Sequence, residues 1–162
     1  MIKNNITRLL ESRKIPYTVH KLPAEKLGAL ETARLLDVEP ETVYKTIVVL
    51  RTGTARGKPI LAVVPGDRDV DLKALARTVG EKKLKLPTQK KAEELTGLQA
   101  GGISPLALTN RGFQVVLDAL AREQEQIHVS GGQRGLNICL PVVDFIDITK
   151  ARLAAISRPS AI

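Results

Sequence analysis

Cysteine, histidine and aromatic residues are scarce in this sequence. Its 162 residues include one cysteine, two histidines, two tyrosines, two phenylalanines and no tryptophan. A single cysteine excludes an intrachain disulfide and a cysteine-based metal cluster. Two histidines without HExxH spacing also argue against a zinc site. The sequence therefore predicts neither a metal nor another cofactor.

Long apolar runs are missing as well. None approaches the roughly 18 residues that a bilayer-spanning helix needs, and the first residues do not resemble a signal peptide. A cytoplasmic protein with no membrane partner is expected. With 43% hydrophobic and 26% charged residues, the composition is that of a folded chain, and the length suits one domain with one core.

Basic residues are in excess. Twenty-five lysines and arginines face 17 aspartates and glutamates, which gives a net charge of +8. This charge favours a polyanionic partner, because neutralised phosphates release counterions. The few aromatic side chains argue against reading single-stranded RNA by base stacking. Contact with the backbone of a folded nucleic acid fits better, although a merely basic surface explains the composition equally well.

Five of the lysines lie close together in the sequence and are here called the lysine cluster: Lys82, Lys83, Lys85, Lys90 and Lys91. Most such runs are solvated helix faces. Beside the net charge, the lysine cluster is the leading candidate for contact with a phosphate backbone.

Hydrophobic periodicity and capping residues divide the chain into short alternating elements. Helices are predicted at 4–14, 29–37, 71–77, 88–95, 119–123 and 141–153, and strands at 17–22, 43–50, 59–65, 83–86, 113–118, 127–129 and 136–140. The polar turn 52–58 makes 43–50 and 59–65 an antiparallel hairpin. These elements predict an α/β (α+β) fold: one domain over residues 1–156, with a mixed, largely antiparallel sheet that curls or closes into a barrel among surrounding helices, and a frayed tail at 157–162.

Lys45 breaks the pattern of its strand. Strand alternation puts it on the face of Val43 and Ile47, the expected inner face. A lysine among apolar groups is costly unless it meets an anion, a carbonyl or water, and burial favours the neutral form used in proton transfer. The alternatives are an edge-strand lysine that prevents aggregation and an ammonium that extends to solvent.

Two glycine-bearing loops are further candidate sites. Gly101 and Gly102 lie in the loop 97–105, and Ser130 precedes Gly131 and Gly132 in the loop 129–135. Glycines let backbone N–H groups approach a carbonyl or a phosphate. Neither loop has the spacing of a P-loop or a dinucleotide fingerprint, and a hairpin turn explains the second almost as well.

Neither loop makes a convincing nucleophile. Pro105 follows Ser104 where a nucleophile elbow would need a different residue, and the local sequence positions neither histidine to activate Ser104 or Ser130. Cys139 lies in an apolar strand and is predicted to be a core thiol.

Three motifs occur in a fixed order along the chain: Val43-Tyr44-Lys45-Thr46, Gly101-Gly102-Ile103-Ser104-Pro105-Leu106 and Val129-Ser130-Gly131-Gly132-Gln133-Arg134-Gly135-Leu136. Together they resemble the YbaK/EbsC-type family of free-standing aminoacyl-tRNA deacylases, and the resemblance covers about residues 6–156. The family is also similar to the editing domain of bacterial prolyl-tRNA synthetases. The resemblance implies the editing-domain fold and proofreading of a mischarged tRNA, with cysteine on tRNA(Pro) as the first expectation.

The resemblance also implies a set of site residues. Lys45 would hold or polarise the aminoacyl end, and the two glycine loops would supply backbone N–H groups and a hydroxyl. In this family the substrate's own thiol is thought to attack its carbonyl, so that the protein only orients the ester and stabilises charge. The implied catalytic residues are Lys45, Ser130, Gly131 and Gly132, and the implied substrate-binding residues are Leu22, Thr46, Gly101, Gly102, Ser104, Pro105 and Asn137.

Two positions depart from the family pattern. Leu22 stands where cysteine-specific members carry a nearby tyrosine, and Asn137 stands where an aspartate is common. A deacylase for another small amino acid such as alanine, a non-catalytic module that binds tRNA or a synthetase, and a regulator that binds a small molecule therefore remain alternatives. The expected partner is the acceptor end of a mischarged tRNA, prolyl-tRNA synthetase is a candidate partner, and both a monomer and a homodimer are compatible.

Overall fold

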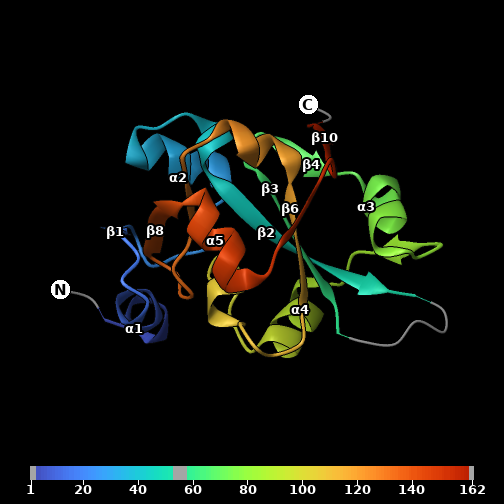
Figure 1. The fold of residues 1–162 in the computed structure, drawn as a ribbon, viewed down its shortest axis with the longest axis horizontal. Helices are drawn as coiled ribbons and strands as arrows, with labels where there is room; N and C mark the ends of the chain where they lie inside the picture. The colour runs from blue at the N-terminus through green and yellow to red at the C-terminus, as the bar shows by residue number, and fades with distance from the viewer. Residues whose placement is uncertain (1–2, 53–57, 161–162) are drawn as a thin grey trace.

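The computed structural model describes residues 3–52 and 58–160. Within these residues the elements are α1 (Asn5–Ser12), β1 (Thr18–Lys21), α2 (Ala29–Leu36), η1 (Pro40–Thr42), β2 (Tyr44–Arg51), β3 (Ile60–Pro65), β4 (Arg68–Val70), α3 (Leu72–Val79), β5 (Leu84–Lys85), α4 (Gln89–Thr96), η2 (Pro105–Ala107), β6 (Gln114–Asp118), η3 (Ala119–Glu123), β7 (Gln126–Ser130), β8 (Leu136–Pro141), α5 (Val142–Thr149), β9 (Arg152–Ala154) and β10 (Ser157–Pro159) (Figure 1). No helix in this part of the chain is both long and apolar enough to cross a membrane.

The strands form a mixed sheet and two smaller ones. The five-stranded sheet has the order β5-β2-β3-β6-β9, in which β2 pairs antiparallel with β3 and β5, and β6 pairs parallel with β3 and β9. The order β1-β8-β7 makes an antiparallel sheet of three strands, and β4 pairs with β10. The predicted hairpin of β2 and β3 and the mixed, largely antiparallel character of the fold are confirmed. The polar turn predicted at 52–58 lies mostly outside the described residues.

One bridge joins the two larger sheets. Val43, just before β2, pairs in parallel with His128 of β7. The two sheets share one core, since Val63 of the large sheet and Ile138 of the small sheet belong to the same buried cluster, with Phe145 of α5. The sheets therefore curl around a common interior, as the sequence predicts.

Strand β2 is covered on both faces. Tyr44 and Val48 belong to the core shared with α5, whereas Val49 belongs to a second cluster with Leu75 of α3. The face of Val43, Ile47 and Val49, predicted to be the inner one, is buried at Val43 and Val49, and the opposite face is buried as well at Tyr44 and Val48.

The C-terminal prediction needs two corrections. The last helix ends at Thr149 and not at residue 153, because Lys150 takes a left-handed conformation and the chain continues as β9 beside β6. The predicted frayed tail is also wrong for Ser157–Pro159, which form β10 against β4. Arg68 holds this pair by donating from Nε to the Ser157 hydroxyl at 2.8 Å.

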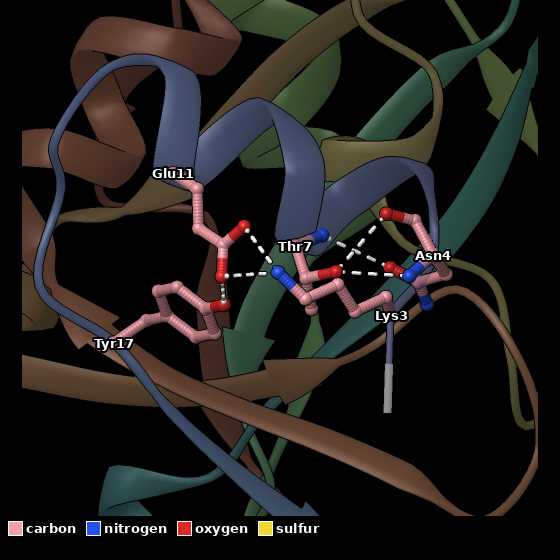
Figure 2. Close-up of polar contacts among 5 residues, drawn as sticks. All are labelled: Lys3, Asn4, Thr7, Glu11 and Tyr17. Carbon is pink, nitrogen blue, oxygen red and sulfur yellow. Dashed lines mark hydrogen bonds and ion pairs between the residues drawn. The ribbon is translucent and has the colours of Figure 1, made fainter. Parts of the chain in front are cut away.

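A capping box begins α1, as Figure 2 shows. The Asn4 side chain accepts from the Thr7 N–H at 3.0 Å, and the Thr7 hydroxyl accepts from the Asn4 N–H at 2.8 Å, so Asn4 is the capping residue. Farther along the helix, Glu11 pairs with the Lys3 ammonium and accepts from the Tyr17 hydroxyl. Asn4 also donates to the Gly131 carbonyl at 2.9 Å, so α1 is tied to the second glycine loop.

The Tyr44 hydroxyl is the one buried side-chain polar atom without a hydrogen-bond partner in the described part of the chain. Burial, assisted by the negative charge of Asp118, raises the pKa of this phenol well above its usual value. An unpartnered buried hydroxyl costs about 1–3 kcal/mol. Tyr44→Phe is therefore expected to raise the free energy of unfolding by about 1 kcal/mol in urea denaturation.

The matched control is Tyr17→Phe, which removes a hydroxyl that donates to Glu11 near the surface. It should leave stability unchanged or slightly lower. A less stable Tyr44→Phe protein would show that the Tyr44 hydroxyl has a partner in solution.

Candidate active site

A cavity of about 310 Å³ lies beside the start of β2, at the lower end of the size range for small-molecule sites. Its walls come from the segment 22–29, the strand β2, the loop 100–103 and the ends of β7 and β8 that flank the second glycine loop. The predicted site residues that line it are Leu22, Lys45, Thr46, Gly101, Ser130 and Asn137. Segments distant in the sequence therefore meet at one site.

The Lys45 ammonium lies near a carboxylate and a backbone carbonyl, as expected for a lysine in an apolar strand. Its side chain is 28% exposed, with Nζ 3.6 Å from Asp69 Oδ1 and 3.4 Å from the Gly66 carbonyl oxygen. The ammonium is thus held at the cavity wall by a carboxylate and a carbonyl. This geometry orients a positive charge without burying it fully.

Ser130 and Asn137 lie opposite each other on β7 and β8. Extending the parallel bridge of Val43 and His128 by two residues brings Lys45 alongside Ser130. The Ser130 Oγ accepts from the Gly132 N–H at 3.3 Å, which leaves the hydroxyl hydrogen available to a ligand. A positive charge and two polar side chains therefore converge on the cavity.

The glycines allow close packing. A Cβ at Gly102 would lie 2.8 Å from the Gln133 Cα, so the two glycine loops touch through their backbones. A Cβ at Gly131 would lie 2.8 Å from Leu136 Cγ, and Gly132 has φ +90° beside Ile6. These residues lie behind the cavity wall.

The N–H groups of three of these glycines are already used. Gly102 donates to the Gln99 carbonyl and Gly131 to the Leu136 carbonyl, both at 2.8 Å, and Gly132 donates to Ser130. The expectation that the glycine loops donate backbone N–H groups to the substrate is therefore not met by Gly102, Gly131 and Gly132, because turn closure consumes these donors.

Ser104 and Pro105 are buried and do not line the cavity. The Ser104 side chain accepts from the Leu106 N–H at the start of η2. In this structure both residues shape the loop that carries Gly101 and Gly102.

The lysine cluster lies on and around β5 and α4, and all five of its side chains are exposed. Lys26, on the cavity wall, donates to Gln89 Oε1 at 2.6 Å, and Gln89 is the first residue of α4. One side-chain contact thus joins the cavity wall to α4, the helix that carries Lys90 and Lys91.

The sequence alone did not reveal several residues of the site. Lys26 and Glu25 line the cavity from a segment without a recognisable pattern, and Asp69 approaches Lys45 from β4. Arg134 donates from Nε to the Ala100 carbonyl at 2.7 Å and so fastens the two glycine loops together. No local sequence signal reports such long-range contacts. In the part of the chain that the structure describes, no three metal-ligating side chains gather.

Residues 25–148 match the model of a family described as "Aminoacyl-tRNA editing domain". The chain belongs to this family. It is 32% identical over 157 residues to the Enterococcus faecalis protein named "Putative Cys-tRNA(Pro)/Cys-tRNA(Cys) deacylase EbsC", and the match covers 96% of this chain and 93% of that protein. It is 26% identical over 115 residues to "Multifunctional Ser/Thr-tRNA deacylase ProXp-y" of Escherichia coli K12, across 70% and 68% of the two chains.

Solved structures show the same editing-domain fold. The crystal structure of "hypothetical protein APE2540" has a TM-score of 0.85 at 22% identity, covering 96% of this chain and 100% of that one. The structure of "a putative trans-editing enzyme for prolyl tRNA synthetase" has a TM-score of 0.78 at 24% identity, covering 98% and 99%. At these identities the likeness concerns the fold alone.

Gly102→Ala tests the backbone contact between the two glycine loops of the editing domain. The new Cβ would press on the Gln133 backbone, which cannot rotate away as a side chain can. We expect a loss of roughly 1–3 kcal/mol in the free energy of unfolding, measured in urea.

Gly28→Ala is the matched control. Gly28 has φ −75°, and a Cβ added there would meet no other atom within 4 Å, so the free energy of unfolding should change little. Equal stability of the two variants would show that the loops are not in backbone contact.

Proposed function

We propose that this protein is an aminoacyl-tRNA deacylase that removes a mischarged amino acid, with cysteine on tRNA(Pro) as the first candidate. The observation that carries the proposal is the Lys45 ammonium at the wall of a small cavity, which separate segments of the editing domain build together. Similarity to EbsC across nearly the whole chain supports the choice of cysteine.

The cavity offers groups for stabilising charge on an ester carbonyl. When a nucleophile attacks the aminoacyl carbonyl, negative charge develops on its oxygen, and donors fixed near that oxygen lower the barrier. Lys45 supplies a positive charge and Ser130 a hydroxyl. The side chains hold and orient the ester beside these donors.

The substrate's thiol is the proposed nucleophile for cysteine. Its sulfur forms a bond to the carbonyl carbon, the bond from that carbon to the ribose oxygen breaks, and the thiol proton passes to this oxygen. The products are a thiolactone and tRNA with a free hydroxyl. Cys139 is unsuited to this role, because it is buried away from the cavity and burial raises the pKa of its thiol.

Hydrolysis by water is the competing route. Glu25 places a carboxylate on the cavity wall and is the candidate base for it. The similarity to ProXp-y, named for seryl- and threonyl-tRNA, favours testing substrates without a thiol.

A panel of Cys-, Ala-, Ser- and Pro-tRNA(Pro) beside Cys-tRNA(Cys) separates thiol cyclisation from hydrolysis by water, since alanine cannot cyclise. Repeating it with prolyl-tRNA synthetase tests delivery by that enzyme.

Lys45→Ala should abolish deacylation without unfolding the domain. Removal of one charge-stabilising group typically lowers kcat about 10²–10³-fold. Release of radiolabelled cysteine from Cys-tRNA(Pro) measures this loss, and thermal melting checks the fold. Lys73→Ala, which removes an exposed lysine on α3, is the control and should retain activity. Normal turnover by folded Lys45→Ala would refute the role of Lys45, and tRNA binding without turnover by the wild type would indicate a non-catalytic binding module.

We also propose that the lysine cluster binds the phosphate backbone of the tRNA. A Lys90→Ala/Lys91→Ala variant should bind uncharged tRNA more weakly, and the slope of log affinity against log salt should decrease by about 1–2. Filter binding at several salt concentrations measures both quantities. Arg122→Ala/Arg158→Ala is the charge-matched control, from exposed residues of η3 and β10. Strand β10 lies at the opposite end of the molecule from α4 (Figure 1). An equal loss in both double variants would refute a localised docking surface.

A further inference from the structure

The sheet of β1, β8 and β7 has one apolar and one polar face. Val129 and Ile138 point into the main core and are fully buried. Alternation turns their neighbours, among them His128 and Asn137, to the other face. That polar face reaches the cavity through Asn137.

A buried hydrogen bond connects these two side chains. His128 Nδ1 lies 2.9 Å from Asn137 Oδ1, and the residues are only 7% and 4% exposed. An amide oxygen only accepts, so His128 Nδ1 carries the hydrogen and donates it. Burial lowers the pKa of His128, against the opposing effect of this hydrogen bond, and the nearby His20 ring lowers it further. The lowered pKa favours the neutral ring, and in the tautomer that fits this contact its single N–H is directed to Asn137.

The amide nitrogen of Asn137, Nδ2, has no hydrogen-bond partner within the described part of the chain. In that part, the Tyr44 hydroxyl is the one side-chain polar atom that is both fully buried and without a partner, so Nδ2 is not fully buried. Nδ2 is thus accessible, and Asn137 lines the cavity. The amide presents two N–H donors to a ligand.

We propose that His128 is a positioning residue that holds the Asn137 amide with its NH₂ group toward the cavity. The part of the substrate beside Asn137 is then recognised as a hydrogen-bond acceptor, such as an ester carbonyl or a ribose oxygen. This inference rests on the proposed deacylase function. Without the bond to His128, the amide would rotate and present its oxygen, which repels such acceptors.

A double-mutant cycle tests the proposal. His128→Phe keeps a planar ring and removes the donor, so kcat/KM for deacylation should fall about 10-fold, within the usual range of coupling between contacting residues. In an Asn137→Ala background the same change should alter kcat/KM less than about 2-fold, because no amide remains to be oriented. Equal losses in both backgrounds would show a merely structural role and overturn the proposal.

Two further variants sharpen the test. His20→Phe removes the neighbouring histidine, whose ring centre is 5.5 Å from that of His128, and should change kcat/KM little. Asn137→Asp replaces the donors with acceptors of similar shape and should lower activity at least as much as His128→Phe. An Asn137→Asp protein as active as the wild type would overturn the assignment of Asn137 as a donor.

Nitrogen-15 NMR of the wild-type protein determines which nitrogen of His128 carries the hydrogen, and this measurement does not depend on an activity assay. His128 should be neutral at pH 7 and protonated at Nδ1. Protonation at Nε2 alone would overturn the proposal, even if His128→Phe fails to fold. Absence of deacylation by the wild type would instead refute the proposed function and leave the NMR result to decide the orientation of the amide.

Discussion

The site depends on the burial of β2 from both sides. Tyr44 and Val48 pack into one cluster and Val49 into another, so β2 can neither shift its register nor twist outward without exposing apolar groups. This constraint fixes Lys45 between Asp69 and the cavity. The bridge from Val43 to His128 then brings the polar face of the small sheet to the same place. A lysine in an apolar strand is tolerable here because the strand begins at a cavity with a carboxylate beside it.

The site also requires the backbones of the two glycine loops to lie in close contact. Gly102 lies directly against Gln133, and Arg134 fastens the second glycine loop to Ala100. The N–H groups of Gly102, Gly131 and Gly132 serve the turns themselves. The spacing of these three glycines is therefore explained by packing and turn closure.

Local signals predicted most elements correctly. Asn4, Asp71 and Thr88 accept from backbone N–H groups at the starts of their helices, and such capping side chains mark helix starts in the sequence. The strands β9 and β10 escaped prediction because each has only three residues and is stabilised by partners far away in the chain, β6 and β4. Alternation over so few residues carries no usable pattern.

The site residues likewise divide into those with a local sequence signal and those that depend on distant contacts. Lys45 was recognisable because it violates the pattern of its own strand, and the glycine loops were recognisable by composition. Asp69, Lys26 and the pairing of His128 with Asn137 depend on which strands become neighbours, which the order of residues does not reveal. Six of the predicted residues line the cavity, whereas Ser104 and Pro105 shape a loop behind it.

The balance of groups around the cavity has a chemical consequence. Lys45, Ser130 and Asn137 can stabilise negative charge on an oxygen. In the described part of the chain, the Ser130 hydroxyl has no hydrogen bond to a base that would make it a nucleophile. His128, the buried histidine nearby, directs its N–H to Asn137 and so orients an amide instead of activating a hydroxyl. In the proposed deacylation, such a site would accelerate attack by a nucleophile that arrives with the substrate or as water. Under the proposed thiol route, selectivity among amino acids would follow from which side chains bring their own nucleophile into reach of the carbonyl, and the cavity would need to recognise only the ester that they share.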